Sequence, residues 1–256
     1  MKAFWACLKK EFLDSARGGR ITVLIILFAA FGVMNPAIAK LTPWMMEMMA
    51  ESLEGSGLAV TEVTVDALTS WTQFFKNIPM ALIIFAVMYS GIFTAEYSSG
   101  TLILMLTKGL SRYKVVLAKT VLLLSFWSVG YWLCLGITYG YNAYFWDNSI
   151  VAHLWVPVLQ WWLFGIWVIS LMVLFSTLSS TNVVVMLGIG GAVLLSYLVS
   201  LLPKVTPYMP TTLMNTAALM LGYEDGGDYI KAVAVTVLLT LVCVAGSIPL
   251  MNRKKL

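Results

Sequence analysis

Between two long apolar stretches, the chain reads Glu96-Tyr97-Ser98-Ser99-Gly100-Thr101, then Leu102-Ile103-Leu104-Met105-Leu106, then Thr107-Lys108-Gly109-Leu110-Ser111-Arg112. The flanking stretches are each long enough to cross a bilayer, and a simple turn would be enough to connect them. The apolar run in the middle is too short to span and too apolar to lie free in water. We therefore expect residues 96–114, called the arm below, to be buried at the membrane interface or in a groove of another protein.

The composition indicates an integral membrane protein. Of the 256 residues, 60% are hydrophobic and only 11% are charged, whereas a soluble domain carries about 25% charged residues. Polar surface is too scarce to cover a water-soluble globule, so the excess apolar surface must face a lipid bilayer. The net charge of +4 does not suggest a nucleic-acid partner.

Apolar stretches of about 18 residues or more are long enough to span a membrane as helices. Backbone polar groups cannot stay unpaired in lipid, and these stretches lack the alternation of β-barrel strands, so we expect helices. The sequence thus predicts an all-α, polytopic membrane protein with one domain over residues 1–256. The six expected spans are Ile21–Ala39, Ile78–Ala95, Val115–Tyr139, Leu154–Phe175, Val183–Leu202 and Ala232–Leu250.

The distribution of basic residues predicts the orientation in the membrane. The arm, the start of the third span and the two ends of the chain hold 12 of the 16 Lys and Arg residues. The connections on the other side hold only Lys40, Lys76, Lys204 and Lys231. Because Lys and Arg accumulate in cytoplasmic segments, we expect a multi-pass protein of the cell membrane with the arm and both termini in the cytoplasm.

Two segments outside the spans have helical patterns. Residues 1–20 mix aromatic and aliphatic side chains with basic ones, which is typical of an amphipathic helix lying on the membrane surface. Gly18-Gly19 would permit the turn into the first span. Beyond that span, Pro43 precedes Trp44–Leu53, which we expect to be a short separate helix in the outer connection.

The sequence contains no convincing catalytic, cofactor or metal site. It has no G-x-x-x-x-G-K-[ST] pattern, so we expect no P-loop. His153 is the single histidine, and the three cysteines lie far apart without a CxxC pair, so neither a metal site nor a disulfide framework is expected. Lys119 is the one charged residue within the expected spans. Its position near a span end would allow it to snorkel into water.

Glu96 lies at the expected end of the second span, where the helix dipole disfavours an acid. We therefore expect a compensating cation, which could be Arg112 or Lys114 across the arm, or a basic group on a partner protein. Ser98 or Ser99 is expected to cap a short helix that begins near Gly100-Thr101.

The arm resembles a loop of the permease subunits of type-2 ABC exporters, in the branch that reads E-x-x-x-G-T-x-x-L-x-L-T-K-P-x-S-R with a following Lys. Asn35-Pro36 and the segment 71–77 are similar to the same branch. The likeness is good up to Phe145 and rests on the number of spans beyond it. Gly109 departs from the proline that is common in this family. The matching residues are Glu96, Gly100, Thr101, Leu104, Leu106, Thr107, Lys108, Ser111 and Arg112 in the arm, and Lys119 beyond it.

This resemblance implies that the arm is a coupling helix, which seats in a groove of a separate ABC ATPase. The residues that would couple the permease to that ATPase are Glu96, Gly100, Thr101, Leu104, Leu106, Thr107, Ser111 and Arg112. The ATPase would bind the ATP and Mg. Two permease copies, identical or related, would form the passage. The branch includes exporters of antimicrobial peptides, drugs, ions and lipid-like molecules. The apolar, aromatic-rich spans favour a hydrophobic or amphipathic cargo.

Two other classes of function remain as alternatives. A membrane-embedded enzyme, such as an intramembrane protease or acyltransferase, needs paired His, Asp, Glu or Ser side chains within the spans, and the single His153 argues against it. An immunity or structural membrane protein working without ATP would have no use for the arm. A stand-alone ABC ATPase encoded next to this chain would favour the exporter.

Overall fold

The computed structural model describes residues 2–52, 65–107 and 109–254, and its regular structure is helical. Six segments are long and apolar enough to cross a membrane, which confirms the predicted all-α architecture with six spans. These segments are Arg20–Met48, Ala67–Ser98, Arg112–Phe145, Trp155–Leu178, Asn182–Ser200 and Gly226–Arg253.

The helices follow the chain in a simple order. The α-helices are α1 (Lys2–Arg17), α2 (Arg20–Ser52), α3 (Ala67–Tyr89), α4 (Gly91–Ser98), α5 (Thr101–Thr107), α6 (Arg112–Phe145), α7 (Trp155–Leu178), α8 (Asn182–Ser200), α9 (Ala217–Met220) and α10 (Ile230–Arg253). Short 3₁₀ helices in the connections are η1 (Asn148–Ile150), η2 (Thr206–Tyr208), η3 (Pro210–Met214) and η4 (Gly226–Tyr229).

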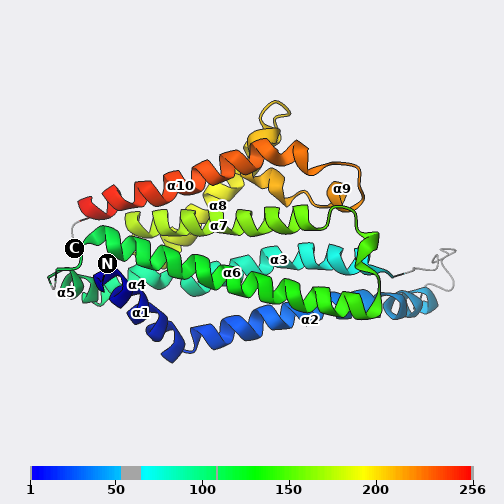
Figure 1. Ribbon diagram of the computed structural model, residues 1–256, viewed down its shortest axis with the longest axis horizontal. Helices are drawn as coiled ribbons and strands as arrows, with labels where there is room; N and C mark the ends of the chain where they lie inside the picture. Colours follow the sequence, from blue (N-terminus) through cyan, green and yellow to red (C-terminus); the bar gives the residue numbers. More distant parts are fainter. Residues whose placement is uncertain (1, 53–64, 108, 255–256) are drawn as a thin grey trace.

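The long helices run side by side along the longest axis of the molecule (Figure 1). α6 lies centrally, because it packs against α1, α2, α3, α7 and α10. Helix α5 lies at one end of the bundle together with α1 and the end of α10, and we call this the arm end (Figure 1). The structure thus places the arm and both ends of the chain on one side, as the charge pattern predicts.

The expected break after the first span is wrong, because α2 continues through Pro36 and Pro43 to Ser52. Proline lacks an N–H and leaves the carbonyl four residues earlier without its helical partner. For Pro36 that carbonyl belongs to Gly32, and it accepts a hydrogen bond of 3.0 Å from Thr138 Oγ1 of α6. The neighbouring helix therefore replaces the missing bond. The separate helix expected at Trp44–Leu53 is instead the last part of α2, and Leu53 lies outside the described residues.

Asn35, next to this proline, joins three helices. Its side chain is fully buried, its Nδ2 donates to Thr138 Oγ1 at 3.1 Å, and its Oδ1 accepts from Asn77 Nδ2 of α3 at 2.8 Å. Polar bonds between membrane helices contribute about 0.6 kcal/mol each on average. Their main effect here is to fix the register of α2, α3 and α6.

The amphipathic segment at the start of the chain is confirmed as a helix, α1. It turns into α2 at Gly19, whose φ of 70° is readily adopted by glycine. Trp5 and Phe12 are exposed on α1, whereas Cys7 and Glu11 are buried. One face of α1 therefore packs on the bundle, mainly against α6, and the other presents aromatic side chains outward.

Close packing between α6 and α7 depends on a glycine. Trp127 of α6 is fully buried, and its Nε1 donates to the carbonyl of Trp162 on α7 at 3.2 Å. A Cβ atom added at Gly165 would lie 2.2 Å from the Trp127 ring. Only a residue without a side chain fits at this contact, so Gly165 sets the separation of the two helices.

We predict that Gly165→Ala destabilises the protein by about 1–3 kcal/mol, because the added methyl group forces Trp127 out of its place. Gly136→Ala on α6 is the matched control, since no atom lies within 4 Å of the added methyl group. The measurement is the midpoint of thermal unfolding in detergent. A Gly165→Ala midpoint equal to that of Gly136→Ala would contradict this account of the packing.

Candidate functional site

The arm consists of the end of α4, the short helix α5 and the first residues of α6. Two glycines make its turns, Gly100 with φ 67° and Gly109 with φ 87°. The predicted short helix is confirmed, although the hydrogen bonds of the two serines differ from helix caps. Ser98 Oγ donates to Ala95 O at 3.0 Å, and Ser99 Oγ lies 2.8 Å from Thr101 Oγ1. Proline holds φ near −65°, so a proline could not adopt the observed backbone of Gly109.

Helix α5 has a buried face and an exposed face. Leu102 is only 1% exposed and belongs to the core of the bundle, whereas Ile103 is 45% exposed. Thr101 and Thr107 are exposed, and Leu106 is half-buried and packs on the core. The side chain of Leu104 and the whole of Lys108 lie outside the described residues. The arm is thus anchored through one face and presents the other outward.

A cluster of charges, called the junction below, lies at the root of the arm and consists of the buried Glu11, Glu96 and Lys119 together with the half-buried Lys10. Lys119 Nζ lies 2.8 Å from Glu11 Oε2 and 3.1 Å from Glu96 Oε2. Lys10 Nζ lies 3.0 Å from Glu11 Oε1 and 2.6 Å from Glu96 Oε1. Two ammonium groups thus bridge two carboxylates, and Lys10 Nζ also lies 3.4 Å from Oδ2 of the exposed Asp14. Every charge of the junction has a partner where burial would make an unpaired one costly.

The junction corrects two expectations from the sequence. Lys119 does not snorkel: it is fully buried, and its Nζ also donates a hydrogen bond to the carbonyl of Ile92 at 2.8 Å. Glu96 pairs with Lys10 and Lys119, not with Arg112 or Lys114. A lysine can stay in the interior because its Nζ donates to Glu11 Oε2 and to Ile92 O and is paired with the Glu96 carboxylate.

The pKa values of the two α1 residues agree with this pairing. Burial alone would raise the pKa of the Glu11 carboxyl, but the Lys119 ammonium and its hydrogen bond hold that pKa below its usual value. Burial alone would lower the pKa of Lys10, but the hydrogen bond to Glu96 and the nearby carboxylates raise it. Both residues are therefore charged at neutral pH.

The sign of each shift defines the pH range of the junction. The stability due to Glu11 is complete above the ordinary Glu pKa of about 4.3 and is lost as the pH falls through the lowered folded-state value. The stability due to Lys10 is complete below the ordinary Lys pKa of about 10.4 and is lost as the pH rises through the raised folded-state value. Lys10 and Glu11 therefore contribute fully to stability throughout the physiological range.

The exit of the arm is held by another set of contacts. Ser111 precedes the first residue of α6, Arg112, whose Nη1 lies 2.7 Å from the carbonyl oxygen of Met251 in α10. Lys114 lies with its Nζ 5.7 Å from the centre of the Tyr113 ring. The structure thus brings Glu96 and Lys119 together at the junction and directs Arg112 toward α10.

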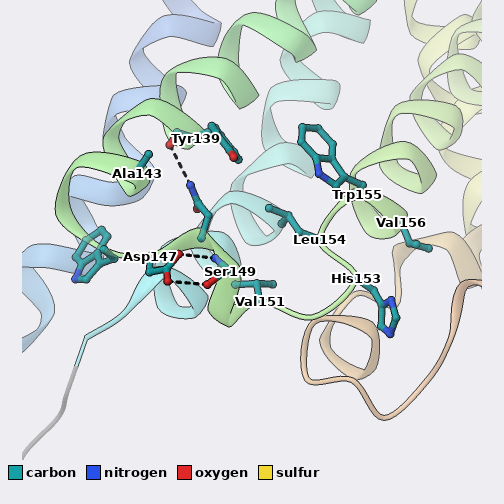
Figure 2. Close-up of a pocket in the computed structure, with 11 residues that line it drawn as sticks. Tyr139, Ala143, Asp147, Ser149, Val151, His153, Leu154, Trp155 and Val156 are labelled. Carbon is teal, nitrogen blue, oxygen red and sulfur yellow. Dashed lines mark hydrogen bonds between the residues drawn. The ribbon is translucent and has the colours of Figure 1, made fainter.

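A hollow with a volume of about 670 Å³ lies at the end of the bundle opposite the arm (Figure 2). Ser149 Oγ donates to Asp147 Oδ2 at 2.6 Å, while His153 Nε2 lies 3.2 Å from Asp225 Oδ1. Figure 2 shows His153 at the edge of the hollow, turned away from Ser149. A nucleophile and its base must be within hydrogen-bonding reach, so these residues do not form a Ser-His-Asp relay.

We predict that Lys119→Met destabilises the protein more than Lys10→Met, although each removes one positive charge from the junction. The Lys119 side chain is 1% exposed and that of Lys10 is 41% exposed. Breaking a buried pair costs about 3–5 kcal/mol, whereas an exposed pair contributes about 1 kcal/mol or less. Reversible unfolding in mixed micelles measures the difference. Equal losses for the two variants would contradict the assigned burial.

Comparison with known proteins agrees with this architecture. Residues 5–221 match the family described as "ABC-2 family transporter protein". This match includes the arm and five of the six candidate spans. The chain is also similar to the "Uncharacterized transmembrane protein YxlG" of Bacillus subtilis (strain 168), with 23% identity over 240 residues that cover 90% of this chain and 89% of that protein. The chain therefore belongs to the ABC-2 family of transporter proteins, as a membrane transport permease.

Proposed function

We propose that this chain is the membrane subunit of an ATP-driven exporter and that its arm docks a separate ABC ATPase. The observation that carries the proposal is the two-sided arm, in which Leu102 is anchored in the bundle while Ile103 is 45% exposed on the same short helix. An amphipathic helix of this kind suits a groove in a partner protein. The family match supports the proposal, because it makes the chain a transporter subunit.

The junction at the root of the arm supports a mechanical role. Glu96 ends the second span, Glu11 lies on α1 and Lys119 lies on α6, so their ion pairs fasten the root of the arm to two other helices. A displacement of the arm by an ATPase would therefore move these helices with it. Glu96 has this internal role in the proposal, while Thr101, Ile103 and Thr107 form the outward face.

The remaining parts of the proposal concern the assembly. ATP and Mg bind to the partner ATPase and not to this chain. Two permease subunits, identical or related, form the passage in the cell membrane, with the arm and both termini in the cytoplasm. Large apolar side chains exposed along α8, such as Leu187, Leu194 and Leu198, give that helix a surface suited to lipid or to a second permease.

An apolar cavity within the spans supports a hydrophobic or amphipathic cargo. Its volume is about 410 Å³, and it lies between α3, α7, α8 and η3. Apolar side chains make most of its wall, and Thr211 and Tyr197 add hydroxyl groups. Such a cavity, with few polar groups, suits a drug-sized molecule with an apolar body. Further residues lining it are Leu82, Trp161, Phe164, Ile189, Gly190 and Val193.

We predict that Ile103→Asp weakens binding of the partner ABC ATPase. Burying an isoleucine contributes about 1.5–3 kcal/mol, which corresponds to a roughly ten- to hundredfold change in Kd. Leu178→Asp is the control, because Leu178 is 55% exposed at the arm end of α7 but lies outside the arm. Co-purification in mild detergent, followed by titration of the purified subunits, gives the affinities. Unchanged ATPase binding by Ile103→Asp would refute the docking role of the arm.

We also predict that Gly190→Leu blocks the apolar cavity while Gly191→Leu does not. At both glycines an added Cβ has no neighbouring atom within 4 Å, so neither position is closed to a side chain at its first carbon, but only Gly190 lines the cavity. The probe is a dodecylamine carrying a photoreactive diazirine, with crosslinked peptides identified by mass spectrometry. Crosslinks to α3 and α8 should fall in Gly190→Leu and persist in Gly191→Leu. Equal labelling of the two variants would exclude this cavity as the site for such a probe.

A further inference from the structure

The end of α10 is held between the two ends of the arm. Arg112 Nη1, at the exit of the arm, lies 2.7 Å from Met251 O, 3.1 Å from Asn252 O and 2.9 Å from Lys254 O. Tyr97, at the entry of the arm, directs its hydroxyl to Met251 Sδ at 3.2 Å. Residues about 140 positions apart in the chain are thus joined by direct contacts.

The chemistry of these contacts suits the end of a helix. The last carbonyl groups of an α-helix lack helical N–H partners, and the helix dipole concentrates negative charge there. A guanidinium group can bond to these carbonyl groups and balance the negative end of the dipole, because it carries several N–H donors in a fixed plane and is always charged. Arg112 is therefore bonded to the end of α10 in a way that a single ammonium could match only in part.

Lys254 adds a further contact at the arm end of the bundle, next to those made by Arg112 and Tyr97. Its Nζ donates to Ser179 O, in the link between α7 and α8, at 2.7 Å and lies 3.7 Å from the centre of the Tyr97 ring. A cation over an aromatic face is attracted by the ring electrons. The arm, the α7–α8 link and the end of α10 therefore converge on Lys254.

We infer that Tyr97, Arg112, Ser179, Met251 and Lys254 form a clasp that makes the arm and the end of α10 move as one body. Arg112 is then a positioning residue inside the permease and does not contact the ATPase. Because α10 packs mainly against α7, the clasp gives the arm a second path into the bundle, separate from the junction on α1 and α6. The transmission of ATPase movement through this path rests on the proposed function, while the clasp itself does not.

The experiment measures the distance between the arm and the end of α10 by pulsed electron paramagnetic resonance. Spin labels are attached through Ser98→Cys and Asn252→Cys, both exposed positions outside the outward face of α5, after Cys7, Cys134 and Cys243 are replaced by Ala. The full-length permease in lipid nanodiscs should give a narrow distance distribution. Arg112→Gln should broaden this distribution and shift it to longer distances, and Arg112→Lys should restore part of the narrow distribution. Lys114→Gln, which removes a neighbouring positive charge, should leave the distribution unchanged. An Arg112→Gln distribution that overlays the parent's would overturn the clasp.

The same labels test transmission once the ATPase is bound. With ATP and vanadate, the Ser98–Asn252 distance should stay constant in the parent complex and change in Arg112→Gln, although ATPase binding is retained in both. A distance that changes with nucleotide in the parent would overturn the inference that the arm and α10 move as one body. If the parent binds no ATPase, the proposed function fails, and the measurement on the permease alone still decides the clasp.

Discussion

The arm depends on a lysine that carries its charge inside the protein. An isolated ammonium in an apolar environment would lose its proton or draw water inward, and Lys119 avoids both because two carboxylates and a backbone carbonyl surround its Nζ. Each of these acceptors comes from a segment that must then stay in place: Glu11 from α1, Glu96 and Ile92 from α4. The position of the arm and the docking of α1 are therefore consequences of keeping one charge solvated by the protein.

In the opposite half of the bundle, buried polar groups without charge also find their partners on neighbouring helices. Pro36 frees the carbonyl of Gly32, and the bundle satisfies it with Thr138 rather than with water. Asn35 and Asn77 extend this contact to α3. Polar atoms thus decide how the helices are arranged at both ends, while the aromatic core between them fills space. The molecule has specific packing although the lipid-facing surface offers no hydrophobic force to bring the helices together.

The sequence predicted the span number and the helical class because both follow from long apolar runs, which need no knowledge of neighbours. It also predicted the short helix of the arm, where an apolar run too short to span stands between glycines. It failed where a distant residue supplied the missing partner. The continuation of α2 past Pro36 depends on Thr138, more than a hundred positions away, and the pairing of Glu96 depends on Lys10 across 86 positions. The acidic Glu11 and Asp14 among the lysines of α1 were the available signal that α1 takes part in ion pairs. The sequence alone does not decide whether Lys10, Arg112 or Lys114 is the cation that pairs with Glu96.

The turn at Gly109 has a consequence for comparative modelling. Proline cannot adopt its φ of 87°, yet proline is common at this position in the exporters that the arm resembles. A chain with proline there must leave α5 by a different route, even if every other arm residue is the same. Using a proline-bearing relative as the template would therefore misplace the start of α6, and with it Arg112, so the geometry of this loop transfers only between relatives that share the glycine.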